Sequence, residues 1–184
     1  MPEAHAARTP GLDVLERGCT TTEALALFDA LPCVRVEEIF GRWRGAEVET
    51  GHPYQGVLAA YGWYGKEFID AETVHPLLFL DAGGELVRVD PRALPPGLAS
   101  HAPRRGGRAA THALSLLKGV VGTNKPRARL RHVEYRGKVS ATMIYDHLPV
   151  HDAFRRVDET TLLGAMDQRG MEEPFLFLLR RVTG

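Results

Sequence analysis

The chain has 184 residues, of which 44% are hydrophobic and 8% aromatic, with 23 basic and 23 acidic side chains and two cysteines. A chain of this length can bury a complete core as one domain without a metal or a disulfide. It has no apolar run near the ~20 residues of a membrane-spanning helix, and its acidic N-terminal stretch does not resemble a signal peptide. We therefore expect a cytoplasmic protein with no membrane span, in which Cys19 and Cys33 are reduced thiols.

The zero net charge is composed of segments of opposite sign. Residues 1–100 have a net charge of −7, residues 101–138 of +9 and residues 139–184 of −2. The basic segment could attract an anionic ligand, although such runs more often form solvated faces or pair with acidic parts of their own fold. Because residues 101–131 contain no aromatic side chain on which bases could stack, we expect no binding of nucleic acid.

The first third of the chain mixes helix and strand patterns. Residues 1–20 are expected to be a loose extension of a single domain that spans residues 21–184. A helix is predicted over residues 20–31, where a Thr-Thr-Thr-Glu run offers an N-cap. An extended segment follows over residues 34–48, and a second helix, interrupted by glycines, is predicted over residues 55–68.

Beyond residue 73 the pattern becomes that of strands. Two apolar runs at residues 75–81 and 85–90 flank Ala-Gly-Gly, which predicts a hairpin. A long loop rich in proline and glycine over residues 91–108 links this part to a short predicted helix at residues 109–120.

The C-terminal part, residues 127–182, is predicted to be a meander of five antiparallel strands. Its last strand is apolar on both faces, so something should cover its outer side. Together with the first strand and the hairpin this gives roughly eight strands, which can close into a barrel wide enough for one small ligand. A two-sheet sandwich fits the count nearly as well. We therefore expect a mainly β fold, an antiparallel meander closing as a calycin-like barrel with two or three short helices.

One tryptophan stands between two glycines inside the first predicted strand, in Gly41-Arg42-Trp43-Arg44-Gly45. Glycines on either side would let the strand bend. The indole would then either close one end of a barrel as a plug or line its cavity.

The chain resembles the small bacterial and fungal family named for this GXWXG motif, with its companion domain of unknown function 4334. The resemblance spans about residues 25–182 and rests on the motif itself, on residues 62–68 and on a C-terminal set from Tyr145 to Asp167. It implies a GXWXG part at about residues 25–95 and no established activity. The Gly-X-Trp signature is also similar to that of calycins, the lipocalin, fatty-acid-binding and nitrobindin-like barrels that hold apolar ligands or haem.

The densest polar cluster spans residues 146–152 and contains two aspartates and two histidines. Such a cluster could bind zinc, supply a general base or ligate haem iron. Pro149 makes the segment a turn, and no third ligand stands nearby, so we predict no metal site. The candidate catalytic residues are His147, His151 and Asp146, none of which belongs to a recognised catalytic motif.

A second candidate site could assemble only in space. Lys66 and Glu67 stand beside three aromatic residues in the sequence, and Tyr145 and Asp146 could join them. The alternating Arg127, Arg129 and Arg131 share one face of a strand and would meet a ligand's anionic head only if that face lined the cavity.

These observations favour a binding protein for a small apolar or amphipathic ligand, such as a fatty acid, a lipid or an isoprenoid, over an enzyme. The alternatives are an enzyme acting on a small hydrophobic substrate in the same cavity, a haem-binding barrel, and a solid-core module that binds a partner. No cofactor is predicted, and the chain could form a homodimer. The residues expected to line or gate the cavity, or to meet the polar head, are Trp43, Tyr61, Trp63, Phe68, Met143, Tyr145, His132 and Arg129.

Overall fold

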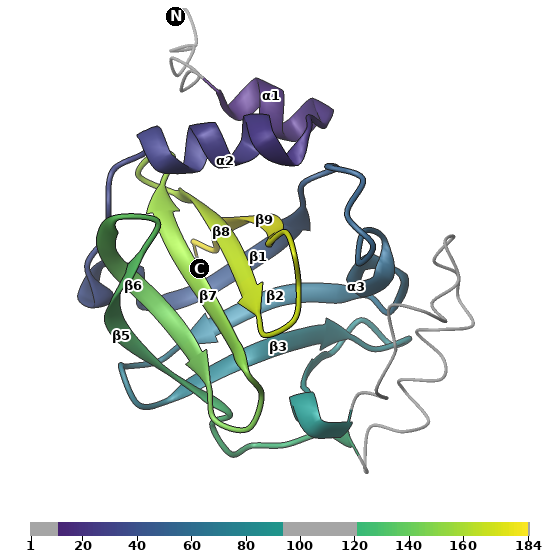
Figure 1. Cartoon of the computed structure of the whole chain (residues 1–184). Helices are drawn as coiled ribbons and strands as arrows, with labels where there is room; N and C mark the ends of the chain where they lie inside the picture. The colour runs from purple at the N-terminus through teal and green to yellow at the C-terminus, as the bar shows by residue number, and fades with distance from the viewer. Residues whose placement is uncertain (1–10, 94–120, 184) are drawn as a thin grey trace, which may run out of the picture.

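The structure is a computed structural model that describes residues 11–93 and 121–183. Its main feature is a sheet of nine strands in the order β2-β1-β9-β8-β7-β6-β5-β3-β4, in which β2 also pairs with β3 (Figure 1). The strands are β1 (Gly41–Glu47), β2 (Trp63–Phe68), β3 (Val74–Leu80), β4 (Leu86–Arg88), β5 (Ala128–Tyr135), β6 (Lys138–Tyr145), β7 (Val150–Arg156), β8 (Thr161–Gln168) and β9 (Phe175–Arg181).

The pairing of β2 with β3 closes eight of these strands into an antiparallel barrel and leaves β4 as an addition to β3. Closure leaves no unpaired edge in the barrel, and it confirms the predicted mainly β barrel over the sandwich. The hairpin and the five C-terminal strands also agree with the prediction. The eight barrel strands are not the eight that were counted, because β2 takes the place of β4.

The predicted helix over residues 55–68 is wrong for most of its length. Only Val57–Ala60 form a helix, α3, and the chain then enters β2. The pairing of β2 with β3 shifts register on both sides of Gly65. These irregularities break the two-residue alternation by which a strand is recognised.

Two helices cover the outside of the barrel. In α2 (Thr21–Ala30), the side chain of Thr20 accepts from the Glu23 amide and Glu23 caps Thr20 in return, which confirms the predicted N-cap. The preceding α1 (Leu12–Arg17) lies within the stretch that was expected to be loose.

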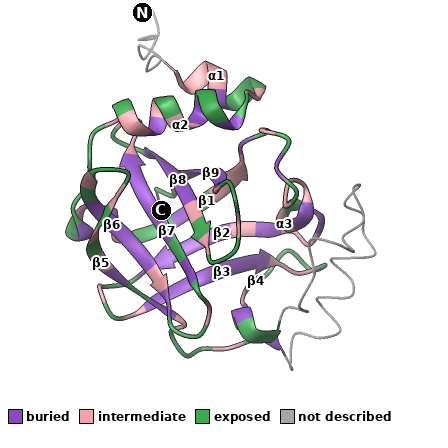
Figure 2. Cartoon of the chain, viewed as in Figure 1, coloured by how far each residue is buried: buried purple, intermediate pink, exposed green. Residues whose placement is uncertain are grey.

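These helices supply the cover that the last strand needs. Phe28 and Leu15 pack with Leu176 and Leu178 on the outer face of β9, in a cluster separate from the interior. In Figure 2 the strands below are mostly buried, whereas the outer side of α2 is exposed.

One end of the barrel is closed by Trp43 and the 3₁₀ helix η1 (Val36–Ile39). The indole Nε1 donates to the Ile39 carbonyl at 2.8 Å. The Arg181 guanidinium lies 4.2 Å from the indole ring and donates to the Phe40 carbonyl at 2.6 Å. Trp43 is only 1% exposed, so its structural part is that of a plug at this end.

The opposite end is where β1, β6 and β8 finish and β2, β7 and β9 begin. We call it the pocket end. The short 3₁₀ helix η2 (Pro91–Ala93) lies at this end, beside Arg127 and Tyr145. Most of the predicted loop over 91–108, the predicted helix over 109–120 and much of the basic segment lie outside the described residues.

Three of the six basic side chains of the basic segment that are described pair with acidic ones. Arg127 pairs with Asp90 at 2.8 Å, and Arg136 pairs with Asp29 at 2.7 Å. These acidic partners come from the N-terminal half of the chain. Within the described residues, no helix is long and apolar enough to cross a membrane.

Candidate functional site

Aromatic rings fill the interior of the barrel. Phe177 on β9 contacts Trp63 on β2 and Phe154 on β7 edge to face, with ring centroids 5.9 and 6.3 Å apart. Phe68 lies against Phe154 at 5.6 Å, and Phe175 stacks on Phe177 at 6.3 Å. These five rings are buried and leave little of the interior surface in contact with water. We call them the aromatic wall.

Two glycines make room for this wall. A Cβ atom on Gly45 would lie 2.3 Å from the Trp63 ring, and a Cβ atom on Gly164 would lie 2.3 Å from the Phe177 ring. The second glycine of the GXWXG motif thus serves the aromatic wall. It was expected to bend the strand, yet it is the first glycine, Gly41, that adopts a positive φ, of 118°.

A buried ion pair stands among these rings. The Lys66 ammonium on β2 lies 2.7 Å from Asp152 Oδ2 on β7 and donates to the Pro76 carbonyl at 3.2 Å. Lys66 is 2% exposed and Asp152 is 0% exposed. The ammonium also lies over the Phe177 ring, 5.0 Å from its centroid, so its charge is held by one carboxylate, one carbonyl and the aromatic faces.

Asp152 is incompletely satisfied. Its Oδ1 is buried and has no hydrogen-bond partner among the described residues. Burial raises the pKa of this carboxyl, and the charge of Lys66 opposes that shift. A buried acceptor without a donor is costly, so this oxygen is suited to a donor that the protein does not provide.

Tyr145 on β6 is the third polar residue near the ion pair of Lys66 and Asp152. Its ring centroid lies 5.8 Å from the Lys66 ammonium. Burial, with a smaller effect of Asp152, raises the pKa of the phenol well above its usual value, so it stays protonated. Tyr145 also borders a narrow crevice at the pocket end with Arg127, His147 and Leu148. We call Lys66, Asp152 and Tyr145 the polar triad.

The structure brings together most of the predicted cavity residues. Trp43, Trp63, Phe68, Met143 and Tyr145 are all buried in the interior cluster, and the half-buried Tyr61 packs against it.

The other predicted residues lie elsewhere. Arg129 and His132 are exposed, and His132 Nε2 accepts the Val36 amide at 3.3 Å. Asp146, His147 and His151 are also exposed. Among the described residues no three metal-ligating side chains gather.

Glu67 has a structural place outside the barrel interior. Its carboxylate accepts from Arg42 at 2.7 Å and from Arg88 at 2.8 Å, joining β1 to β4 through β2. These two guanidinium groups lower the pKa of Glu67 against the opposing effect of burial. Of the adjacent pair singled out in the sequence, only Lys66 therefore belongs to the interior.

Asp152 is the residue that the sequence interpretation undervalued. It was considered with Asp146 as part of one polar turn. Asp152 however lies on β7, in step with the buried Val150 and Phe154, while His151 faces outward. Alternation along β7 would have placed this carboxylate inside the barrel.

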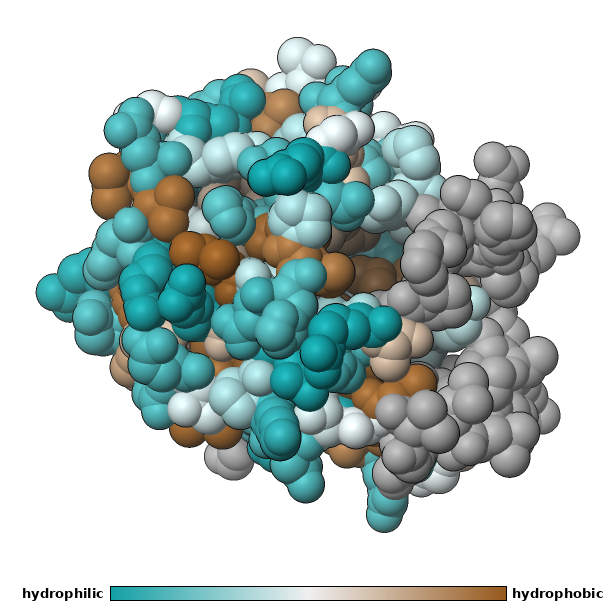
Figure 3. All heavy atoms as spheres, turned by 60° about the horizontal axis from the view of Figure 1, so that its bottom comes forward, coloured by the Kyte–Doolittle hydropathy of each residue, from teal (hydrophilic) through white to brown (hydrophobic). Residues whose placement is uncertain are grey.

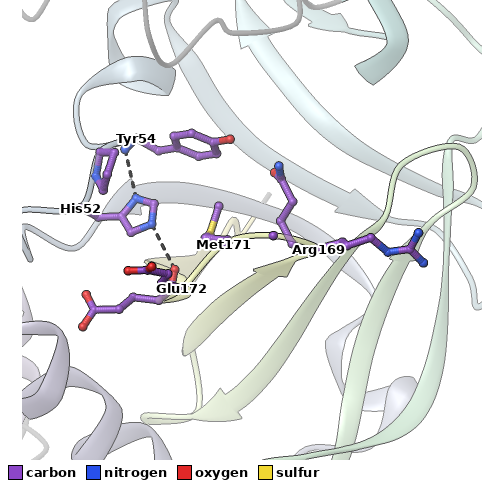
Figure 4. A pocket seen from close by; sticks show the side chains of 9 residues that line it. His52, Tyr54, Arg169, Met171 and Glu172 are labelled. Carbon is purple, nitrogen blue, oxygen red and sulfur yellow. Dashed lines mark hydrogen bonds between the residues drawn. The ribbon is translucent and has the colours of Figure 1, made fainter.

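A pocket of about 390 Å³ opens at the surface between residues 52–54 and the β8–β9 connection. His52 ties its two sides, because Nδ1 accepts the Tyr54 amide at 3.0 Å and Nε2 lies 3.2 Å from the Glu173 carbonyl. Figure 4 shows these two bonds, with Arg169 pointing away from the imidazole. Figure 3 shows apolar atoms gathered in a recess on one face, beside polar side chains.

The pocket is connected to the ion pair through ring contacts. The His52 ring lies 5.5 Å from Phe175, which stacks on Phe177, and Phe177 faces Lys66. Phe175 therefore lies between His52, which lines the surface pocket, and Phe177, which faces Lys66.

Two family models match successive parts of the chain. Residues 26–84 match the GXWXG protein family, and residues 126–181 match the domain of unknown function DUF4334. A protein from Thermomonospora curvata, known from its crystal structure, is 33% identical over 90% of each chain, with a TM-score of 0.69. No curated protein matches the chain.

Proposed function

This chain belongs to the family that joins a GXWXG domain to DUF4334, and from the chemistry of its interior we propose that it is a binding protein for a small amphipathic molecule. The ligand's apolar part would lie against the aromatic wall. Its polar group would meet Lys66, Asp152 and Tyr145. Access would be from the pocket end, where residues 52–54 and the β8–β9 connection frame the surface pocket.

The observation that carries this proposal is the buried ion pair with an unpartnered carboxylate oxygen. Replacing such a pair by apolar side chains of similar size is often neutral or stabilising by a few kcal/mol. The fold alone therefore gives little reason to keep a lysine and an aspartate inside the barrel. A ligand that completes their hydrogen bonds does give a reason.

The aromatic wall would supply most of the affinity. Burial contributes roughly 0.8 kcal/mol per methylene group, so a chain of about ten carbons would supply about 8 kcal/mol before ordering costs. Because the interior side chains are packed against one another, binding would require some of them to move. Of the predicted cavity residues that are buried, Trp63 and Tyr145 retain the most exposure, at 9% and 8%.

A second candidate is acid–base catalysis on the same bound molecule. It is favoured by the raised pKa of Asp152, which brings this buried carboxyl closer to the range in which it can exchange a proton. His147 and His151 are both exposed, and His147 lies beside Tyr145 at the narrow crevice. Haem ligation has no comparable support, since the three histidines weighed for the cavity or for iron, these two and His132, are all exposed.

The proposal is tested by thermal unfolding of the full chain with amphiphiles whose chains have about four or about ten carbons and whose head groups are the same. A ligand that binds only the folded state raises the melting temperature with its concentration. We expect the amphiphile with about ten carbons to raise the melting temperature and the one with about four carbons, at equal concentration, to leave it unchanged. Equal effects of both, or no shift across alcohols, acids and amines, would refute binding in the barrel.

A further inference from the structure

The charges inside the barrel are already balanced. The Lys66 ammonium forms an ion pair with Asp152 Oδ2 at 2.7 Å and donates a hydrogen bond to the Pro76 carbonyl at 3.2 Å. Around its remaining side lie the faces of Phe177, Trp63 and Tyr145, with ring centroids between 5.0 and 5.8 Å away. One ammonium proton therefore has no described oxygen to meet, while the charge itself is neutralised by Asp152.

Among the described residues, the ion pair of Asp152 is made with Lys66 alone, and four arginines are engaged elsewhere. Arg42 and Arg88 hold Glu67 on the outside. Arg127 holds Asp90. Arg181 is committed at the closed end, where it lies on Trp43 and donates to backbone carbonyls. An anionic head group would thus have to share Lys66 with Asp152, which would bring two carboxylates together in a medium of low dielectric constant.

Within the ion pair itself, one hydrogen-bond acceptor and one donor remain without a partner among the described residues. Asp152 Oδ1 lacks a donor among the described residues, and Lys66 has one proton left. A hydroxyl group donates one proton and accepts another. It therefore complements both groups and adds no charge to a neutral pair. An ammonium group would satisfy Asp152 but would stand beside Lys66.

We infer that the polar group of the ligand is a neutral hydroxyl bound between Asp152 Oδ1 and the Lys66 ammonium, so that the ligand class is a long-chain or isoprenoid-like alcohol. This inference rests on the proposed function. It differs from the sequence-based expectation of an arginine or histidine meeting an anionic head, because the arginine and histidine weighed for that role, Arg129 and His132, lie exposed.

The experiment compares three probes of equal chain length, decanol, decanoate and decylamine, by isothermal titration of the full chain near neutral pH and below their aggregation limits. We expect decanol to bind at least about tenfold more tightly than either charged probe. Decanoate or decylamine binding as tightly as decanol would overturn the hydroxyl assignment and leave the proposed function standing. No binding by any probe would overturn both.

A variant makes the test sharper. Asp152→Asn removes the carboxylate and leaves the Lys66 charge without its partner. The variant should therefore bind decanoate more tightly than decanol, the reverse of the wild-type order. Asp167→Asn removes an exposed carboxylate from the neighbouring strand β8 and should keep the wild-type order. An unchanged order in a folded Asp152→Asn protein would overturn the inference. Should that variant fail to fold, the wild-type comparison still decides it.

Discussion

At the scale of single residues, the two ends of the barrel are held by different contacts. Trp43 is fixed at the closed end by its bond to the Ile39 carbonyl and by the Arg181 guanidinium on its ring. At the pocket end, His52 bridges the Tyr54 amide and the Glu173 carbonyl. The Tyr54 amide donates its proton to Nδ1, so Nδ1 must be an unprotonated acceptor. The imidazole is therefore neutral, with its proton on Nε2.

This arrangement predicts a dependence of stability on pH. Burial lowers the pKa of His52 below the ordinary 6.5, against smaller effects of Glu173. The unfolded chain therefore takes up the proton first as the pH falls. The stabilisation is complete above about pH 6.5 and is lost as the pH falls through the lower pKa of the folded state.

We predict that His52→Gln flattens the fall in unfolding free energy between about pH 7.5 and about pH 5.5, as measured by urea denaturation. Some slope should remain, since burial also lowers the pKa of His75. His151→Gln, at an exposed position, serves as the control and should keep the wild-type slope. A slope in His52→Gln equal to that of the wild type would refute the role of His52.

The residues of the site could be only partly predicted from the sequence. Lys66 and Tyr145 were singled out, because a lysine beside aromatic residues and a tyrosine on an alternating strand are local signals. Their meeting with Asp152 is not local, since β2 and β7 are not neighbours in the sheet. The pair forms only because the sheet closes and both side chains point inward.

At the scale of elements, β2 has the most unusual construction. Gly65 has a φ of 149°, and a Cβ atom there would lie 2.0 Å from the Trp43 carbonyl oxygen, so β1 and β2 approach closely at this point. Across the same pair of strands, Gly45 lies under the Trp63 ring. Gly65 is one of the glycines that interrupt the predicted helix, and here it permits the close approach of β1 and β2, whereas Gly45 on β1 leaves room for the Trp63 ring.

We predict that Gly45→Ala destabilises the protein by about 2–3 kcal/mol, the order of cost of overpacking a core, because the new methyl group would displace the Trp63 ring. The near-ultraviolet circular dichroism of tryptophan should change with it. Gly83→Ala is the matched control, since at that exposed turn the nearest contact is the flexible Asp81 carboxylate at 3.3 Å. Equal stability of Gly45→Ala and the wild type would contradict this role of the motif.

Local patterns explain why some elements were predicted and β2 was not. The α2 helix has a capping box, and the C-terminal strands follow one another with short connections. In β2, four consecutive residues from Gly65 to Phe68 are buried, because the inner side faces the core and the outer side carries Glu67 with its two arginine partners. Neither a helical nor a two-residue period describes such a strand.

At the scale of the whole molecule, three regions of the barrel surface differ in what covers them. Its outer face over β7–β9 is covered by α1 and α2, its closed end is sealed by Trp43, and its pocket end leads through stacked rings to Lys66 and Asp152. The overall class was predictable because eight strands with short connections favour closure. Which strands close the barrel depends on pairings between distant parts of the chain.

The central claim is that the polar triad and the aromatic wall hold a small molecule, and native mass spectrometry of protein purified from cells tests it most directly. The double variant Lys66→Met with Asp152→Leu replaces the ion pair by apolar groups of similar size and should fold with a stability close to the wild type. We predict a bound amphipathic molecule on the wild-type chain and none on the variant. A wild-type chain that stays empty even after incubation with long-chain amphiphiles, or a folded variant that keeps the same molecule, would contradict the account.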